Sequence, residues 1–507
     1  MRPAACIAIA LLGYWSASAG STIREVTVVG GKVEGTFDDG VASFKGVPYA
    51  AAPLGALRWQ APQSVIPWKG VRKTNSFALP CPQSVARSDW SEDCLYLNIW
   101  TAASSAREKR PVMVWIHGGG FVAGTTSNPV LDGTQLARRG VVLVSIAYRL
   151  GPLGFLAHPD LDHQRGGGSG EFGLQDQIAG LRWVRDNIAG FGGDPRRVTI
   201  FGQSAGGISV NVLAAAPAAR NLFQRAISES GPKVFEATQS ARSPGELLRP
   251  LQAAEADGVE FLRTLGAPDI QTARELPVSS LVGRYTPGRF APVIGGSLLP
   301  RPVYAAYAAG DFNATPVLIG YNSADGALDA PPNATPAMFD SLLNVVPSSC
   351  KSHAAAVLST YPHASDAEAL QAIKALARDV SYGWNTWTWA RLQTRSGRGR
   401  VYVYYFDVRT PHSPEGSAHQ AEIPYVFGTL GPSAAAEDIQ LSTLIRQYWS
   451  NFSAKGDPNG PGLPWWPAFR PESPQMMIFG HSGSPQPWQN ADRMRLIDNY
   501  LGCTRAN

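Results

Sequence analysis

One pentapeptide of the chain has the pattern that a serine nucleophile requires. Gly202-Gln203-Ser204-Ala205-Gly206 is the only Gly-x-Ser-x-Gly in the sequence, with a glycine two positions before and two positions after its serine. It follows one apolar run, Val198–Phe201, and precedes another, Ile208–Leu213, which predicts a strand, a sharp turn and a helix. Because such a turn holds the serine hydroxyl exposed, Ser204 is the candidate nucleophile of an acyl transfer.

A glycine run offers the second element of this chemistry. His117-Gly118-Gly119-Gly120-Phe121 follows the apolar run Val112–Ile116, which predicts a loop at the end of a strand. Acyl transfer builds negative charge on an oxygen, and backbone N–H groups of a glycine loop can approach that oxygen without a Cβ in the way. A flexible or phosphate-binding loop is the alternative, but no Gly-Lys-Ser/Thr follows, which excludes a Walker motif.

A serine nucleophile also needs a base and a carboxylate that orients it. Where the serine lies on such a strand–turn–helix, the acid comes after the serine along the chain, and the histidine comes after the acid. Two of the eight histidines, His412 and His419, follow the predicted strand Val401–Val408 on a loop from which a base could reach the serine. The residues alone do not choose between these two.

The elements that must position these residues alternate between strands and helices. Apolar residues at three- or four-residue spacing predict a helix from Leu174 to Ile188, which Phe191–Pro195 ends. Through residues 110–230 the alternation predicts a mostly parallel sheet covered by helices. We interpret 232–290 as an insertion near the site, and 364–396 as one or two helices whose tryptophans line the core or the cleft. The predicted strands are Glu25–Val29, Leu95–Trp100, Val112–Ile116, Val141–Tyr148, Val198–Phe201, Val317–Gly320 and Val401–Val408.

The composition excludes a nucleic-acid-binding protein. The 507 residues are 44% apolar and 16% charged, which supports a large packed core. The net charge of +5 is spread along the chain without a basic run, so the chain lacks the electrostatic footprint that binding to DNA or RNA requires.

The N-terminus has the pattern of a secretory signal peptide over residues 1–19. Arg2 supplies the positive start, Ala4–Trp15 is a short apolar run, and Ala17-Ser18-Ala19 is a small-x-small cleavage site. No later segment has about 18 uninterrupted apolar residues, so we expect no membrane span and a secreted or periplasmic mature protein, with residues 20–507 as one domain.

Four cysteines remain after that cleavage, and disulfides are the default for them in an exported protein. Cys81 and Cys94 close a short local loop, which leaves Cys350 and Cys503 as a second pair. No Cys-x-x-Cys or His-x-x-x-His spacing accompanies them, so no metal site is predicted.

Further motifs occur along nearly the whole mature sequence. They are Phe44–Ala50, Ser91–Asn98, Tyr148–Gly151, Phe191–Val198, Phe201–Gly207, His419–Gly428 and Gly456–Asn459. On these motifs the chain resembles the type-B carboxylesterase family, which includes cholinesterases and bacterial para-nitrobenzyl esterases. The resemblance implies an α/β-hydrolase fold with helical insertions around an active-site gorge. It also implies Ser204 as nucleophile and the N–H groups of Gly119, Gly120 and Ala205 as the oxyanion hole. The family's histidine motif, His-x-x-Glu-Ile-x-x-Val-Phe-Gly, begins at His419 and selects it over His412.

The acid departs from the family pattern. The usual glutamate stands in Gly-x-Asn-x-x-Glu-Gly, and this chain has Asp325 at that place in Gly320–Gly326. Aspartate does the same work in other hydrolases of this architecture, so Asp325 is the expected acid. The alternative is a turn aspartate before a glycine. Cys81 and Cys94 match the family's first disulfide, whereas the pair of Cys350 and Cys503 has no clear counterpart.

Two further departures concern the substrate. Cholinesterases carry a glutamate just before the nucleophile and a choline-stacking tryptophan in a long disulfide loop. This chain has Gln203 there, and only twelve residues between Cys81 and Cys94, with Trp90 near the end of the loop. We therefore expect an exported serine carboxylesterase that hydrolyses uncharged esters without metal or cofactor. A catalytically silent binding relative and a lipase are the alternatives, although no apolar lid is identifiable.

Overall fold

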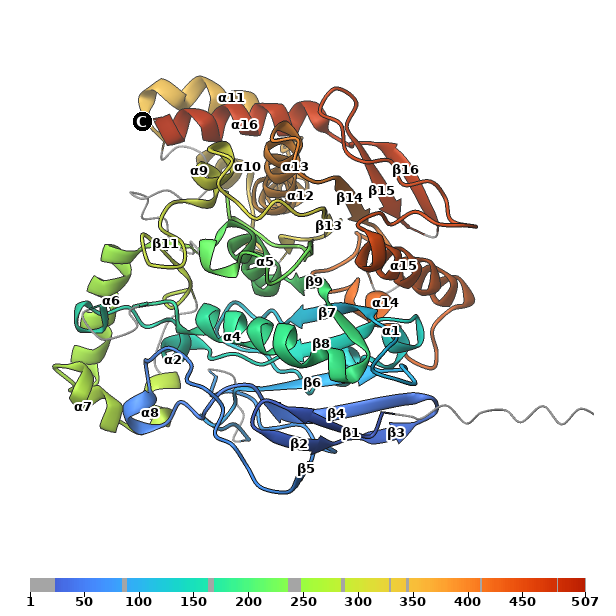
Figure 1. Cartoon of the computed structure of the whole chain (residues 1–507). Coiled ribbons are helices and arrows are strands. Elements are labelled where there is room, and N and C mark those ends of the chain that lie inside the picture. The colour runs from blue at the N-terminus through green and yellow to red at the C-terminus, as the bar shows by residue number, and fades with distance from the viewer. Residues whose placement is uncertain are drawn as a thin grey trace, which may run out of the picture.

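A large β-sheet forms the centre of the molecule (Figure 1). The computed structural model describes residues 23–83, 89–162, 168–235, 248–283, 288–327, 330–342, 346–410, 413–480 and 482–506. The predicted signal peptide, residues 1–19, and His412 lie outside these residues. Within them, eleven strands pair in the order β16-β15-β14-β13-β10-β9-β7-β8-β6-β4-β3.

The middle of this sheet is parallel, and its margins are antiparallel. All neighbours from β15 to β8 in that order run parallel, while β16, β6, β4 and β3 pair in the antiparallel sense. The predicted mostly parallel sheet is therefore confirmed. The strands are β16 (Gly483–Pro487), β15 (Gln475–Phe479), β14 (Val401–Phe406), β13 (Val317–Asn322), β10 (Arg225–Glu229), β9 (Gly193–Gln203), β7 (Arg110–Ile116), β8 (Val142–Ile146), β6 (Tyr96–Thr101), β4 (Val41–Pro48) and β3 (Thr36–Asp38).

Helices cover both faces of the sheet, because the central strands carry apolar side chains on both faces. In β7, Val112 and Val114 pack into one buried cluster, whereas Met113 and Trp115 pack into a second one. Successive side chains of a strand point to opposite faces, so each cluster lies on one side of the sheet. Buried residues of α4 and α5 belong to the first cluster, and those of α1, α14 and α15 to the second.

The helix bounds follow the predicted pattern most closely in the central part. The helix expected over Leu174–Ile188 is α4, which spans Phe172–Asn187 and continues as a 3₁₀ turn to Phe191. The other helices are α1 (Thr134–Arg138), α2 (Gly151–Phe155), α3 (Pro159–Asp162), α5 (Ala205–Ala215), α6 (Leu251–Thr264), α7 (Ile270–Glu275), α8 (Val278–Val282), α9 (Val303–Ala308), α10 (Pro336–Ser341), α11 (Lys351–Leu358), α12 (Asp366–Arg378), α13 (Trp384–Arg395), α14 (Ile423–Phe427), α15 (Ala436–Lys455) and α16 (Ala491–Ala506).

The two segments that the sequence analysis set apart are helical. The described part of 232–290 contains α6, α7 and α8, which lie together at the left of Figure 1. Residues 364–396 form α12 and α13, joined by a π-helical turn, Asp379–Gly383. Trp384, Trp387 and Trp389 on α13 are buried, which confirms that they belong to the core.

The sequence analysis missed most short strands. Two of them, β2 (Gly31–Glu34) and β5 (Val71–Lys73), form a small separate sheet near the N-terminus with the predicted strand β1 (Glu25–Val28). A further pair joins β11 (Arg249–Pro250) and β12 (Val293–Ile294). The strand β10, in the middle of the large sheet, was also missed. Among the described residues, no helix is both long and apolar enough to cross a membrane.

Two disulfides join the cysteines in the expected pairs. Cys81 is bonded to Cys94, and Cys350 to Cys503. The second bond attaches the C-terminal helix α16 to the segment that precedes α11, and α11 and α16 pack side by side (Figure 1). Both pairings are those that the sequence analysis names.

Candidate active site

The predicted catalytic residues come together at the carboxyl ends of the parallel strands. Ser204 directly follows β9, the glycine run follows β7, and Asp325 follows β13. His419 lies between β14 and α14. Because β7, β9, β13 and β14 run in the same direction, their ends share one edge of the sheet, which is where open α/β sheets place their ligand sites.

Ser204 stands on a strained turn between β9 and α5. Its backbone has φ 58° and ψ −123°, a region that side-chain-bearing residues rarely adopt. The turn is held by its N–H, which donates to the Glu229 carbonyl at 2.9 Å. Small neighbours are required, because a Cβ on Gly206 would lie 2.1 Å from the Ile116 carbonyl oxygen of the adjacent strand. This is the strand–turn–helix geometry that the sequence predicts.

The glycine loop lies against this turn. A Cβ on Gly118 would lie 2.5 Å from the Gln203 carbonyl oxygen, so the loop approaches the turn as closely as only glycine permits. Gly119 and Gly120 have φ of +106° and +63°. Their backbone N–H groups have no hydrogen-bond partner among the residues that the structure describes. Ala205, as the first residue of α5, has no intrahelical acceptor either. The three expected oxyanion donors are thus available to a ligand.

The histidine before the glycine run is structural. His117 is buried and stacks on Tyr148 with ring centroids 4.4 Å apart, and Tyr148 Oη donates to its carbonyl at 2.8 Å. Burial lowers the pKa of His117 to about 4, so its imidazole is neutral at physiological pH. This ring supports the glycine loop.

His419 and Asp325 form a direct hydrogen bond. His419 Nδ1 lies 2.6 Å from Asp325 Oδ1, and the carboxyl group is buried while the imidazole remains partly exposed. The other carboxyl oxygen, Oδ2, accepts from Ser230 Oγ at 2.8 Å and from the Asn322 N–H at 2.7 Å. Three partners therefore fix the acid, and it orients Nδ1 of the ring.

The loops that carry the acid and the histidine are bonded to each other. The Ser417 N–H donates to Ser323 Oγ at 2.8 Å, and the Ala324 N–H donates to the Ser417 carbonyl at 2.9 Å. Asn322 Nδ2 donates to the Ala418 carbonyl at 2.9 Å. These bonds hold the acid loop against the histidine loop, as the shorter aspartate requires.

Gln203 places the imidazole beside the nucleophile turn. Its Nε2 lies 3.2 Å from His419 Nε2 and 3.4 Å from Nδ1, and Gln203 is the residue before Ser204. The ring of Tyr382, on the π-helical turn, is tilted relative to the imidazole, with centroids 5.6 Å apart. His419 is thus close to both a neutral amide and an aromatic ring. Within the described residues, no group of three or more His, Cys, Asp or Glu side chains could hold a metal ion.

Several contributors to this site were missed by sequence reasoning. Ser230 follows β10, a strand that the apolar pattern did not predict, so nothing marked it. Glu422 lies inside the motif that begins at His419, and Asn322 inside the stretch Gly320–Gly326, but their types alone did not indicate contacts with Asp325 or with each other. Tyr382 had no signal, because a π-helical turn cannot be read from helical periodicity.

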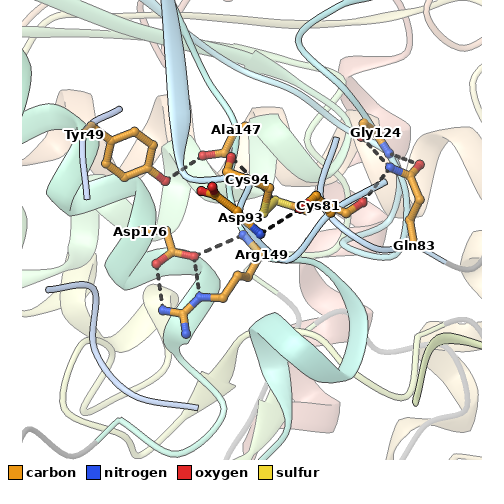
Figure 2. Close-up of a disulfide and its surroundings, with 10 residues drawn as sticks. Tyr49, Cys81, Gln83, Asp93, Cys94, Gly124, Ala147, Arg149 and Asp176 are labelled. Carbon is orange, nitrogen blue, oxygen red and sulfur yellow. Dashed lines mark hydrogen bonds and ion pairs between the residues drawn. A yellow bond between two sulfur atoms is a disulfide. The ribbon is translucent and has the colours of Figure 1, made fainter. Parts of the chain in front are cut away.

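The first disulfide supports the glycine loop through Gln83 (Figure 2). Gln83 Nε2 donates to the carbonyls of Cys81 and Gly124, each at 3.0 Å, and the Gly124 N–H donates back to Gln83 Oε1 at 3.1 Å. Gly124 packs against the His117 ring, because a Cβ there would lie 2.2 Å from Nδ1. The bond between Cys81 and Cys94 therefore anchors the outer end of the loop.

Removing this bond in a Cys81→Ala/Cys94→Ala variant is expected to lower the melting temperature. Closing a loop of about fifteen residues is worth about 3 kcal/mol in the chain-entropy model. Activity measured well below the melting temperature should persist, because the bond lies outside the reacting centre. Calorimetry of the parent and the variant checks this, with non-reducing peptide mapping to show the linked peptide. Free thiols at both positions in the purified protein would contradict it.

The comparisons with known proteins agree with this geometry. A sequence model of the carboxylesterase family matches residues 22–495. The chain is 35% identical over 481 residues to the fumonisin B1 esterase of Sphingopyxis macrogoltabida, covering 89% of this chain and 85% of that one. It is 34% identical over 480 residues to the para-nitrobenzyl esterase of Bacillus subtilis (strain 168), covering 90% and 95%.

A solved structure is similar to this chain over almost the whole length of this chain. A para-nitrobenzyl esterase structure matches with a TM-score of 0.80 and 31% identity, covering 94% of this chain and all of that one. The predicted α/β-hydrolase fold is thereby confirmed. The chain belongs to the carboxylesterase family.

Proposed function

We propose that this carboxylic ester hydrolase cleaves uncharged carboxylic esters through an acyl-enzyme formed on Ser204. The observation that carries the proposal is the 2.6 Å bond between His419 Nδ1 and Asp325 Oδ1, at the sheet edge where the Ser204 turn meets the glycine loop. In a neutral imidazole that donates through Nδ1, the lone pair lies on Nε2, and this nitrogen is the one that accepts the serine proton. Asp325 then stabilises the imidazolium that results.

In the first half of the reaction, Ser204 Oγ attacks the ester carbonyl carbon while His419 Nε2 takes the hydroxyl proton. The carbonyl oxygen becomes an oxyanion, to which the N–H groups of Gly119, Gly120 and Ala205 donate. Each donor of this kind is worth about 3 kcal/mol of transition-state stabilisation. When the tetrahedral intermediate collapses, His419 returns the proton to the leaving alcohol, and the acyl group stays on Ser204.

In the second half, water attacks the acyl carbon and gives its proton to His419. Collapse breaks the bond to Oγ, returns the proton to Ser204 and releases the carboxylic acid. Each group recovers its starting protonation state, so no cofactor is consumed.

A fluorophosphonate reagent tests this assignment. It should form one covalent adduct, which peptide mapping places on Ser204, and a chromogenic ester should show a burst of alcohol release of about one equivalent when deacylation is slower than acylation. An adduct on another serine would overturn the choice of nucleophile. If neither adduct nor turnover occurred, the protein would be a silent relative that only binds.

Selectivity against cationic esters is expected from the neutral amide of Gln203, which is buried beside His419. A quaternary ammonium group loses hydration on binding and needs an aromatic face or a negative charge in return. The kcat/KM for a neutral short-chain ester should therefore exceed that for the matching choline ester. In the matched variant Gln203→Glu the ratio should narrow, because a carboxylate would stand beside the site. If the parent enzyme had the higher kcat/KM for the choline ester, a cation site would exist. Trp90 and Tyr382 would then be the first aromatic residues to replace.

We also propose export of the mature protein to the periplasm or the medium. The support is the signal-peptide pattern over residues 1–19 together with the two disulfides, because such bonds are rare in the reducing cytosol. N-terminal sequencing of the protein recovered outside the cytoplasm should begin at Gly20.

A further inference from the structure

A cavity of about 430 Å³ lies beside the last turns of α13, away from the proposed catalytic residues. Its lining comes from α9, from α13 and from the segment that precedes β15. The other end of α13 adjoins the π-helical turn of Tyr382, and the twelve residues of this helix rise about 18 Å. Small-molecule sites have volumes of about 300–1,000 Å³. The cavity is therefore large enough for a small organic molecule and separate from the active site.

The charged side chains that line this cavity are mostly arginines. They are Arg391, Arg395, Arg470 and Glu472. Arg391 donates to Asp498 on α16, which compensates its charge and fixes its position. Neither Arg395 nor Arg470 has an ion pair or a side-chain hydrogen bond within the described part of the chain. Two unpaired guanidinium groups therefore face one cavity, and Glu472 is the single carboxylate among its described lining residues.

A fourth arginine contacts the aromatic wall of the cavity. The Cζ of Arg505, on α16, lies 4.2 Å from the ring centroid of Tyr304, which lines the cavity, and 5.2 Å from that of Trp384. Its Nη1 is buried and has no hydrogen-bond acceptor among the residues that the structure describes. Buried donors are normally paired, so this region has more cationic donors than acceptors. The charge of Arg505 adds to the positive potential at the cavity.

The uncharged part of the lining suits an apolar body. Tyr304 on α9, Leu392 on α13 and Pro471 present an aromatic ring and two aliphatic side chains. Leu392 is buried, and the other two are partly buried. The planar guanidinium group of arginine can donate two parallel N–H bonds to one carboxylate or phosphate group. The cavity thus combines donors for an oxyanion with a surface for a hydrocarbon skeleton.

We propose that this cavity binds a small organic anion. Its carboxylate or phosphate group pairs with Arg395 and Arg470, and its aromatic or aliphatic body packs against Tyr304, Leu392 and Pro471. An anion between the two arginines lowers the electrostatic energy of two like charges, whereas a neutral molecule of the same shape does not. The inference does not depend on the serine mechanism, because other residues line this cavity.

Titration calorimetry of the full chain with benzoate and phenyl phosphate is the first test. Both probes have an aromatic body, and they differ in the anionic group, so the one that binds more tightly identifies the preferred group. Benzyl alcohol and inorganic phosphate should each bind at least about tenfold more weakly, because each lacks one half of the ligand. The proposal is overturned if neither anion binds, or if benzyl alcohol binds as tightly as both anions.

Substitutions of exposed lining residues locate the bound anion. Arg395→Gln and Arg470→Gln should each raise the Kd by about tenfold, since a charge-assisted bond is lost. Arg470→Lys keeps the charge without the planar fork, so its Kd should lie between those of the parent and Arg470→Gln. Glu472→Gln should lower the Kd, because it removes a like charge.

Arg263→Gln is the matched control for these variants. Arg263 is an exposed arginine on α6, where it pairs with Glu260, and its replacement should leave the Kd unchanged. An unchanged Kd in both Arg395→Gln and Arg470→Gln would place the anion elsewhere and refute the site. A Kd raised by Glu472→Gln would refute its electrostatic basis.

Blocking the proposed nucleophile separates this cavity from the active site. Protein that carries a fluorophosphonate adduct on Ser204 should bind the preferred probe with the Kd of untreated protein. Loss of binding in the treated protein would place the anion at the oxyanion donors and overturn the proposal. If the reagent formed no adduct, the serine mechanism would fail, and the arginine variants would still decide whether the cavity binds an anion.

Discussion

Replacing Ser204 with alanine is expected to lower kcat for a neutral ester by at least about a thousandfold, because losing a triad nucleophile typically costs several orders of magnitude. The variant lacks the Oγ that attacks the carbonyl, and nothing in the turn replaces it. What remains is the oxyanion site, which stabilises charge but forms no acyl-enzyme. Steady-state kinetics on a chromogenic ester measure the loss, and active-site titration accounts for traces of parent enzyme.

Ser209→Ala is the matched control for this loss. Ser209 lies on α5, the helix that Ser204 precedes; it is buried and accepts a hydrogen bond from Gln177 Nε2 at 3.0 Å. Its removal should lower stability by about 1 kcal/mol, the usual net value of one such bond, and leave kcat near the parent value. Activity of Ser204→Ala above a thousandth of the parent kcat, in protein free of parent enzyme, would mean that another residue is the nucleophile.

The elements that sequence reasoning predicted are those in which local pattern and tertiary environment agree. Residues 198–203 of β9 and all of α5 are buried, and the glycines two positions before and after Ser204 can serve only a close turn. The same holds for the glycine loop after β7. These segments would fold in this way in almost any α/β context, which is why the strand, the turn, the helix and the glycine loop could be predicted from residues alone.

β10 shows why other parts of the site could not be predicted. Its five residues, Arg225–Glu229, begin and end with charged side chains, and a central strand is not expected to bury a glutamate without a cation. Its position between β9 and β13 overrides that pattern. Glu229 and Ser230 went unnoticed for this reason, although both contact the catalytic loops.

The choice of base was likewise beyond the residues alone. His412 and His419 are both in the segment after β14, and only the family motif favoured His419. The structure adds the pairing of two loops more than ninety residues apart, through Ser323, Ser417 and Asn322. His419 is the histidine that this pairing brings to Asp325. Long-range contacts of this kind leave no periodic trace in a sequence.

Replacing Asp325, the proposed acid, is expected to have the second large effect on kcat. Asp325→Asn is expected to lower kcat by about a hundredfold or more while the fold persists, because the wrong histidine tautomer is then favoured. The reason lies in the contacts of Oδ2, which accepts from Ser230 Oγ and from the Asn322 N–H. The backbone donor cannot turn away, so the amide oxygen of the asparagine must face it. The NH₂ group then faces His419 Nδ1, which has to become an acceptor.

A histidine that accepts at Nδ1 carries its proton on Nε2 and cannot take one from Ser204. Asp325→Glu restores the carboxylate, and a cavity of about 80 Å³ that borders Asp325, Lys374 and Arg378 offers room for the added methylene group. This variant should exceed Asp325→Asn in kcat by at least about tenfold, since the tautomer is again correct. Circular dichroism and melting curves show whether both variants fold. An unchanged kcat in Asp325→Asn would assign the acid elsewhere, and Glu422, whose charge interacts with His419, would be the next carboxylate to replace.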